Sequence, residues 1–160
     1  MHFESRRGAA MLTALLMLTC VPHRAWADGR RASPAPVLPA YQQECGACHL
    51  AYPPGLLPAA SWQRLMSRLP QHFGVDASLD AATAEPLSAW LTANAATYKR
   101  VAEQPPQDRI TRSPWFARKH DEVAASIWSR PTVKSAANCA ACHTQAEQGD
   151  FSEHRIRIPR

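Results

Sequence analysis

Two short motifs with the same spacing of cysteine and histidine carry the clearest chemistry in this 160-residue sequence. Both read Cys-x-x-Cys-His, and their defining residues are Cys45, Cys48 and His49 in the first and Cys139, Cys142 and His143 in the second. Two thiols at this spacing on one helical turn can add across the two vinyl groups of a haem, and the histidine then reaches the iron as its proximal ligand. The spacing therefore predicts two covalently attached c-type haems.

Three other interpretations of the four cysteines compete with haem attachment. A thioredoxin-like redox pair needs a strand–helix–strand context, which the sequence does not show. A zinc site of four cysteines and two histidines is conceivable, but it does not require a histidine directly after the second cysteine of both motifs. Two disulfides, the default for four cysteines in an exported protein, leave both histidines without a role. Haem attachment is the interpretation that uses all six residues.

The first 27 residues have the layout of a secretory signal peptide. A pair of arginines precedes an apolar run, Ala9–Leu18, and Ala25–Ala27 offers the small-x-small pattern that a signal peptidase cleaves. The apolar run is too short to span a bilayer. We therefore expect export to the periplasm, cleavage after Ala27 with loss of Cys20, and no permanent membrane span. An N-terminal anchor that stays on the protein is the alternative.

Size and charge limit what the rest of the chain can be. Removing the leader takes three of the 18 basic and one of the 13 acidic residues, so the remainder has a formal net charge of only +3. No basic run with interleaved aromatic residues is present, so nucleic acid is not an expected partner. A chain of this size buries limited apolar surface, and small exported folds usually need a covalent or metal staple. Two covalent haems would supply that staple.

The pattern after the leader predicts an all-α fold of two small helical c-type haem modules with long irregular loops. Residues 28–38 are expected to form a flexible N-terminal segment, residues 39–103 the first haem module and residues 104–160 the second. A segment rich in glutamine and proline, 103–107, is the predicted linker between the modules. Nowhere does the sequence alternate apolar and polar residues as a strand does.

Caps, prolines and apolar spacing predict the helices of both modules. In the first module, a short helix over 40–44 leads into the first motif, Ser61 caps a second helix, and Thr83 opens a third. In the second module, a serine followed by proline opens a helix over 113–131. A last helix, over 133–143, is expected to present the second motif.

A haem iron that carries electrons, rather than binding gas or substrate, needs a second axial ligand. Outside the leader and the motifs, the candidate ligands are His72, His120, His154 and Met66. His72 lies in a predicted turn after the first motif, whereas Met66 lies in an apolar helical stripe, where methionine usually fills the core. His120 shares an apolar helix face with Phe116. We predict His72 and His120 as the distal ligands, with Met66 and His154 as open alternatives.

Longer stretches of the sequence resemble the small dihaem cytochrome c family. They are Cys48–Ala59, Ser61–Trp62, His72–Gly74, Ser113–Phe116, Lys119–Glu122 and Asn138–His143. The resemblance covers nearly all of the chain after the leader and is more specific than the haem motifs alone. It implies two low-potential haems, each held by two histidines, with His72 and His120 at the distal positions. It also implies electron exchange with a small oxygen-binding monohaem cytochrome or a membrane cytochrome b.

These observations predict an exported electron carrier, not an enzyme, whose partners are redox proteins. The competing class is a haem enzyme or a gas-binding haem protein in which one iron keeps an open or labile distal face. Dihaem peroxidases and nitrite-type reductases need a shaped distal pocket with acid–base groups and generally a larger chain. Carbon monoxide binding to the reduced protein separates the two classes.

Overall fold

The computed structural model of the protein describes residues 37–99 and 101–160. All of these residues belong to one compact unit. The predicted leader, residues 1–27, and nearly all of the predicted N-terminal segment, 28–38, lie outside the described residues. None of the described helices is long and apolar enough to cross a membrane.

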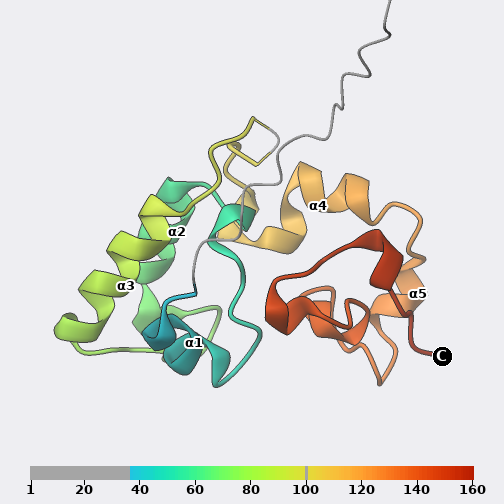
Figure 1. Ribbon diagram of the computed structural model, residues 1–160, viewed down its shortest axis with the longest axis horizontal. Coiled ribbons are helices and arrows are strands. Elements are labelled where there is room, and N and C mark those ends of the chain that lie inside the picture. Colours follow the sequence, from blue (N-terminus) through green and yellow to red (C-terminus); the bar gives the residue numbers. More distant parts are fainter. Residues whose placement is uncertain (1–36, 100) are drawn as a thin grey trace, which may run out of the picture. The chain divides into compact units, whose positions relative to one another are not determined.

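Helices and short 3-10 turns make up the regular structure of the described residues (Figure 1). The helices are α1 Pro39–Gly46, α2 Ala59–Met66, α3 Ala81–Ala93, α4 Pro114–Lys119 and α5 Ala125–Trp128. The 3-10 turns are η1 Pro54–Leu56, η2 Leu69–Gln71, η3 Pro106–Asp108, η4 Ile110–Arg112, η5 Cys139–Ala141, η6 Ala146–Gln148 and η7 Glu153–Arg155. In this part of the chain, strand-like pairing is limited to three isolated bridges. The predicted all-α fold with long loops is confirmed.

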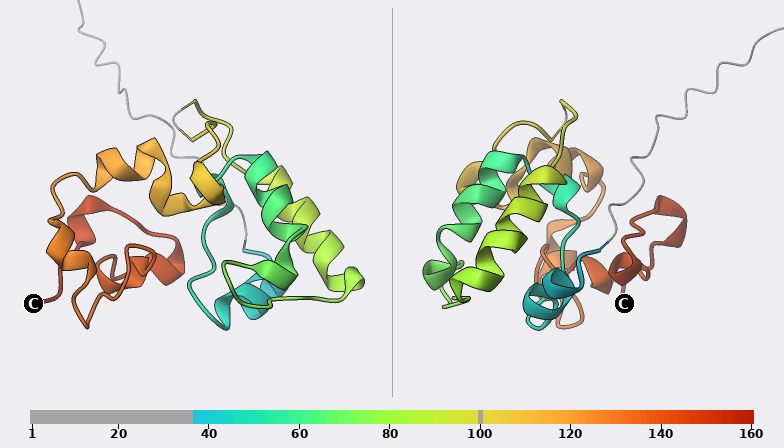
Figure 2. Two further views of the ribbon diagram at one scale, coloured as in Figure 1. Left: turned by 180° about the vertical axis from the view of Figure 1, so that it is seen from behind. Right: turned by 60° about the vertical axis from the view of Figure 1, so that its left-hand side comes forward.

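One hydrophobic core holds the first three helices together. α2 and α3 lie side by side in each view of Figures 1 and 2, and α1 contacts α3. Leu87 and Leu91, one turn apart on α3, are each 1% exposed. Burying a leucine contributes about 1.5–3 kcal/mol, so this face of α3 contributes strongly to the stability of the core. The buried members of the core are Tyr41, Leu57, Trp62, Leu87, Leu91 and Ala95.

The caps predicted for α2 and α3 are both wrong. α2 begins at Ala59, and Ser61 is buried inside its first turn instead of preceding the helix. α3 begins at Ala81, and its N-cap is Asp80, whose carboxylate accepts the backbone N–H of Thr83 at 2.9 Å. Aspartate is the stronger cap of the two, and the chain offers it three residues earlier than Thr83. Both helices therefore start earlier than the sequence pattern suggested.

The single helix predicted over 113–131 is two short helices. Ser113 does cap α4, since its hydroxyl accepts the N–H of Phe116 at 3.1 Å. At the other end, Nδ1 of His120 bonds to the carbonyl of Phe116 at 2.9 Å. The backbone N–H of His120, which would bond to this carbonyl in a continuing helix, donates to the carbonyl of Ala117. Because the imidazole occupies the acceptor of the next helical bond, α4 ends at Lys119.

The helix predicted over 133–143 is also wrong. Lys134 has a left-handed conformation with φ of 67°, which a right-handed helix cannot continue through. The side chain of Asn138 donates a hydrogen bond to the carbonyl of Val133 at 3.0 Å and closes this segment as a loop. The second motif therefore begins on a single 3-10 turn, η5, and its Cys142 and His143 follow that turn.

Candidate haem sites

The first site brings together two histidines from separate turns. His49 follows the end of α1, and His72 follows η2. The centroids of their rings are 6.1 Å apart, and the ring planes are nearly parallel at 19°. Nδ1 of His49 lies 2.7 Å from the carbonyl oxygen of Leu50. Since a carbonyl only accepts, this nitrogen carries the proton, and Nε2 keeps its lone pair for a metal.

His72 lies in a tight turn, and a cation lies over the ring of the next residue. Phe73 and Gly74 have φ of 50° and 102°, and glycine adopts such a value without steric penalty. The Phe73 ring packs edge-on against His72 at 4.8 Å, and the guanidinium carbon of Arg109 lies 4.2 Å from the Phe73 centroid. Nδ1 of His72 is buried without a hydrogen-bond partner. Burial, and then the charges of His49 and Arg109, lower the pKa of His72. The ring therefore favours the neutral form that binds metals.

The second site pairs His120, at the end of α4, with His143 of the second motif. Their ring centroids are also 6.1 Å apart, but the ring planes are steeply inclined at 75°. His120 stacks on Phe116 at 4.0 Å, and its Nδ1 bond to the carbonyl of Phe116 leaves Nε2 for a metal. His143 packs against Phe151 at 5.4 Å, and its Nδ1 is buried without a partner. Burial and then His120 lower the pKa of His143, while Asp150 opposes them.

Both histidine pairs have the separation that a shared iron requires. An imidazole nitrogen binds a metal at about 2 Å, so two nitrogens on opposite sides of one ion lie about 4 Å apart. The centre of each imidazole ring lies roughly 1 Å behind its nitrogen. The two ring centres are therefore about 6 Å apart. The two pairs match this value at 6.1 Å each. The residues present therefore fit a haem iron held from both faces at each site.

Three of the four motif cysteines lie in surroundings that do not favour a redox-active thiol. Burial raises the pKa of Cys45 to about 11 and also raises the pKa of Cys139 and Cys142. Redox-active thiols have lowered pKa values instead. No disulfide joins the four motif cysteines. No cluster of three or more His, Cys, Asp or Glu side chains in the described part of the chain could hold a metal ion directly. The thioredoxin-like, disulfide and zinc interpretations are therefore disfavoured.

The two alternative ligands lie in different surroundings. Met66 packs against the hydrophobic core of α1, α2 and α3. His154 is exposed within η7. The rings that lie opposite His49 and His143 are those of His72 and His120.

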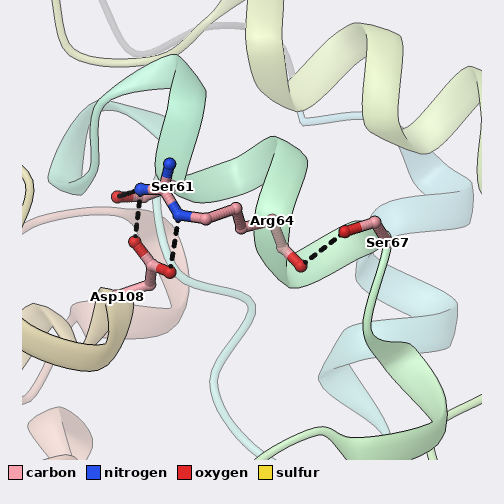
Figure 3. Close-up of polar contacts among 4 residues, drawn as sticks. All are labelled: Ser61, Arg64, Ser67 and Asp108. Atoms are coloured by element: carbon pink, nitrogen blue, oxygen red, sulfur yellow. Dashed lines mark hydrogen bonds and ion pairs between the residues drawn. The ribbon is translucent and has the colours of Figure 1, made fainter.

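An ion pair fixes the loop that carries Arg109. Arg64 on α2 donates to the carboxylate of Asp108 from Nε at 3.0 Å and from Nη2 at 2.7 Å, and Nη2 also reaches the Ser61 hydroxyl at 3.3 Å (Figure 3). These bonds lower the pKa of Asp108. Gln107 and Asp108 both have left-handed conformations, with φ of 59° and 55°. The ion pair crosses the module boundary predicted at residue 103, and that boundary stays a prediction.

Sequence reasoning missed a tyrosine beside the first site. The ring of Tyr52 stacks on His49 at 5.0 Å and 23°, and its hydroxyl donates a hydrogen bond to the carbonyl of Ala137 at 2.6 Å. The two partners are 85 residues apart, so no spacing pattern indicates the bond. The one local feature that could have indicated this contact is an aromatic residue three positions after the motif histidine.

The paired histidines, the two attachment motifs and the helical fold define a c-type cytochrome with two haem sites. The profile of a family described as dihaem cytochrome c matches residues 41–151, which is more than half of the chain. The chain therefore belongs to the dihaem cytochrome c family, and its cofactors are two c-type haems. Comparison with curated protein sequences finds no match.

Solved structures of dihaem cytochromes c are similar to this chain. One from Shewanella baltica OS155 has a TM-score of 0.67 and 39% identity, and the match covers 76% of this chain and 92% of that one. One from Rhodobacter sphaeroides has a TM-score of 0.66 and 46% identity, covering 74% of this chain and 100% of that one. Another structure from Rhodobacter sphaeroides has a TM-score of 0.63 and 49% identity, with coverage of 72% and 98%. The likeness extends over almost the full length of each of these proteins.

Proposed function

We propose that this chain is an exported electron carrier in which two histidines hold each haem iron. The proposed axial pairs are His49 with His72 and His143 with His120, and the proposed attachment thiols are Cys45, Cys48, Cys139 and Cys142. The observation that carries the proposal is the equal centroid separation of 6.1 Å in the two histidine pairs.

The chain's own residues orient the proposed ligands. The bonds from Nδ1 of His49 and of His120 to backbone carbonyls orient these rings and leave Nε2 of each ring for the iron. When bound, a c-type haem supplies a one-electron change between ferric and ferrous iron. Because an imidazole would occupy each face of each iron, no face is left for a substrate. Two closed faces at each iron would favour a carrier rather than an enzyme.

Haem content and carbon monoxide binding test the ligation. The purified holoprotein is expected to hold two haems per chain, measured as the pyridine haemochrome, and to be low-spin in both oxidation states. The spectrum of the reduced protein should not change on addition of carbon monoxide. A shifted Soret band in the wild-type protein would reveal an open or labile face, and it would favour the class of haem enzymes and gas-binding proteins.

Export is supported by the layout of the first 27 residues. The mature protein is expected in the periplasmic fraction with Asp28 as its N-terminal residue, as determined by N-terminal sequencing. Recovery of a chain that still carries the leader, in the membrane fraction, would indicate a retained anchor instead.

The proposed partners are redox proteins, namely a small oxygen-binding monohaem cytochrome or a membrane cytochrome b, and the family resemblance supports them. Rapid mixing of the reduced holoprotein with each oxidised candidate tests this part of the proposal. The expected result is oxidation of the holoprotein at a rate that rises with partner concentration. Absence of transfer to either candidate would contradict the proposed partners and leave the ligation unaffected.

A further inference from the structure

Tyr52 touches residues of both haem sites. Its ring stacks on the imidazole of His49, with 5.0 Å between centroids and 23° between planes. Its hydroxyl donates a hydrogen bond of 2.6 Å to the carbonyl of Ala137, in the loop just before the second motif. One side chain therefore contacts a proposed ligand of the first haem and the backbone that leads into the attachment site of the second.

The acceptor carbonyl is also bonded to the second motif itself. The backbone N–H of Cys139 donates to the carbonyl of Ala137 at 3.0 Å, so this oxygen accepts from the side chain of Tyr52 and from the backbone of Cys139. A continuous series of contacts thus runs from the ring of His49, through Tyr52 and the Ala137 carbonyl, to Cys139.

A second tyrosine bonds to the backbone of Tyr52. The hydroxyl of Tyr41 donates to the backbone carbonyl of Tyr52 at 2.8 Å. Tyr41 is 3% exposed within the core of the first three helices, where its ring lies 5.1 Å from that of Trp90. The backbone of Tyr52 is therefore anchored to the core while its hydroxyl reaches the second motif, which leaves the side chain little freedom to move.

We infer that Tyr52 is the positioning residue that connects the two haem sites and provides the route for electron exchange between them. Its ring orients His49, and its hydroxyl holds the segment that carries Cys139 against the first site. The exchange converts one ferrous iron to ferric and the other ferric iron to ferrous, and it requires no proton or other reactant. This role rests on the proposed function, because it takes His49 as an axial ligand and the protein as an electron carrier.

Three variants of the holoprotein separate the two contacts of Tyr52. Y52F keeps the ring on His49 and removes only the hydroxyl that bonds to Ala137, whereas Y52L removes both contacts. Y98F is the matched control, because the hydroxyl of Tyr98 donates to the carbonyl of Gly55 at 3.1 Å, and both residues belong to the predicted first haem module, 39–103. Each variant is first checked for two haems per chain and for its melting temperature.

The main readout is NMR of the haem methyl groups during stepwise reduction. When electrons exchange rapidly between the haems of one molecule, the methyl lines of half-reduced molecules are averaged, and slow exchange broadens or splits them. We expect averaged lines in the wild-type protein and in Y98F, and at least several-fold slower exchange in Y52F. Y52L should show the same loss, and in addition a changed low-spin EPR signal from the first haem, because His49 loses its stacking partner.

The outcomes for Tyr52 and for the proposed function can be told apart. If Y52F holds two haems and exchanges electrons as fast as Y98F, the role of its hydroxyl is overturned. If Y52L leaves the EPR signal unchanged, the orienting role of its ring is overturned. If the wild-type protein itself lacks two low-spin haems, the proposed ligation fails before Tyr52 is in question.

Discussion

The imidazole of His49 lies nearly parallel to that of His72, at 19°, whereas the rings of the second pair are inclined at 75° with the same centroid separation. In a bis-histidine haem, parallel rings act on the same iron d orbital and separate it in energy from its neighbour. Perpendicular rings leave the two orbitals nearly equal. We therefore expect the oxidised protein to give two distinct low-spin EPR signals, a rhombic one from the first haem and a highly anisotropic one from the second.

Substitution of one histidine at a time assigns these signals. H72A should abolish the rhombic signal and leave the anisotropic one, and H120A should do the reverse. Two rhombic signals of equal shape in the wild-type protein would contradict the difference between the ring planes.

Removal of a distal histidine should open one iron and leave the other closed. H72A and H120A are each expected to bind carbon monoxide at one haem of the two when reduced, because the ligand that closes that face is gone. Titration of the Soret change against haem content measures the fraction of haem that binds carbon monoxide. The matched controls are H154A and Met66→Leu, and neither variant should bind carbon monoxide. Carbon monoxide binding in either control would identify that residue as a ligand and contradict the assignment of its histidine competitor.

The cation over Phe73 should raise the reduction potential of the first haem. Arg109 lies 4.2 Å from the Phe73 centroid and contributes to the lowered pKa of His72, so its positive charge reaches this site. A nearby positive charge disfavours ferric iron relative to ferrous iron. R109Q is therefore expected to lower the potential of one haem, by an amount on the order of tens of millivolts. Spectroelectrochemical titration of both haems measures the change.

Retention of charge supplies the control for Arg109. R109K keeps the positive charge but loses the flat guanidinium that stacks on Phe73. The reduction potential of the first haem in R109K should stay close to the wild-type value. An equal drop in R109K and R109Q would assign the effect to packing, and a shift in the second haem alone would contradict the placement of the charge.

Local sequence patterns predicted which histidines lie close together, but they did not predict where the helices between them begin and end. The two motifs and the histidine in a turn before glycine are short-range signals, and the structure brings His49 beside His72. The helix expected over 113–131 failed because the side chain of His120 competes for a backbone acceptor, which apolar spacing does not reveal.

Contacts between distant residues were beyond the reach of the sequence pattern. Arg64 and Asp108 are 44 residues apart, and Tyr52 and Ala137 are 85 apart. Each of these residues resembles an ordinary surface residue in its own segment. Only folding brings the partners together, so neither the ion pair nor the hydrogen bond has a signature in local spacing.

The bond between Arg64 and Asp108 holds a loop in an unfavourable conformation. Gln107 and Asp108 are not glycine, yet both have positive φ, at 59° and 55°. A residue with a side chain adopts this conformation only when its surroundings compensate. The side chain of Asp108 is 13% exposed, and it accepts two bonds from the guanidinium of Arg64. The ion pair is the compensation that the structure provides.

Asp108 should make the stability of the protein depend on pH at acidic values. The Arg64 guanidinium lowers the pKa of this carboxyl in the folded protein, while in the unfolded chain it returns to about 3.9. The stability that the ionised Asp108 adds to the folded protein is therefore fully present above the pKa of the unfolded chain. It is lost as the pH falls through the lower pKa of the folded protein. D108N should lower the melting temperature of the holoprotein by a few degrees at neutral pH, with the difference shrinking below about pH 4. Scanning calorimetry measures this difference. The same substitution in an R64Q background should have much less effect, because the partner is already gone. An equal effect in both backgrounds would mean that the ion pair does not stabilise the loop.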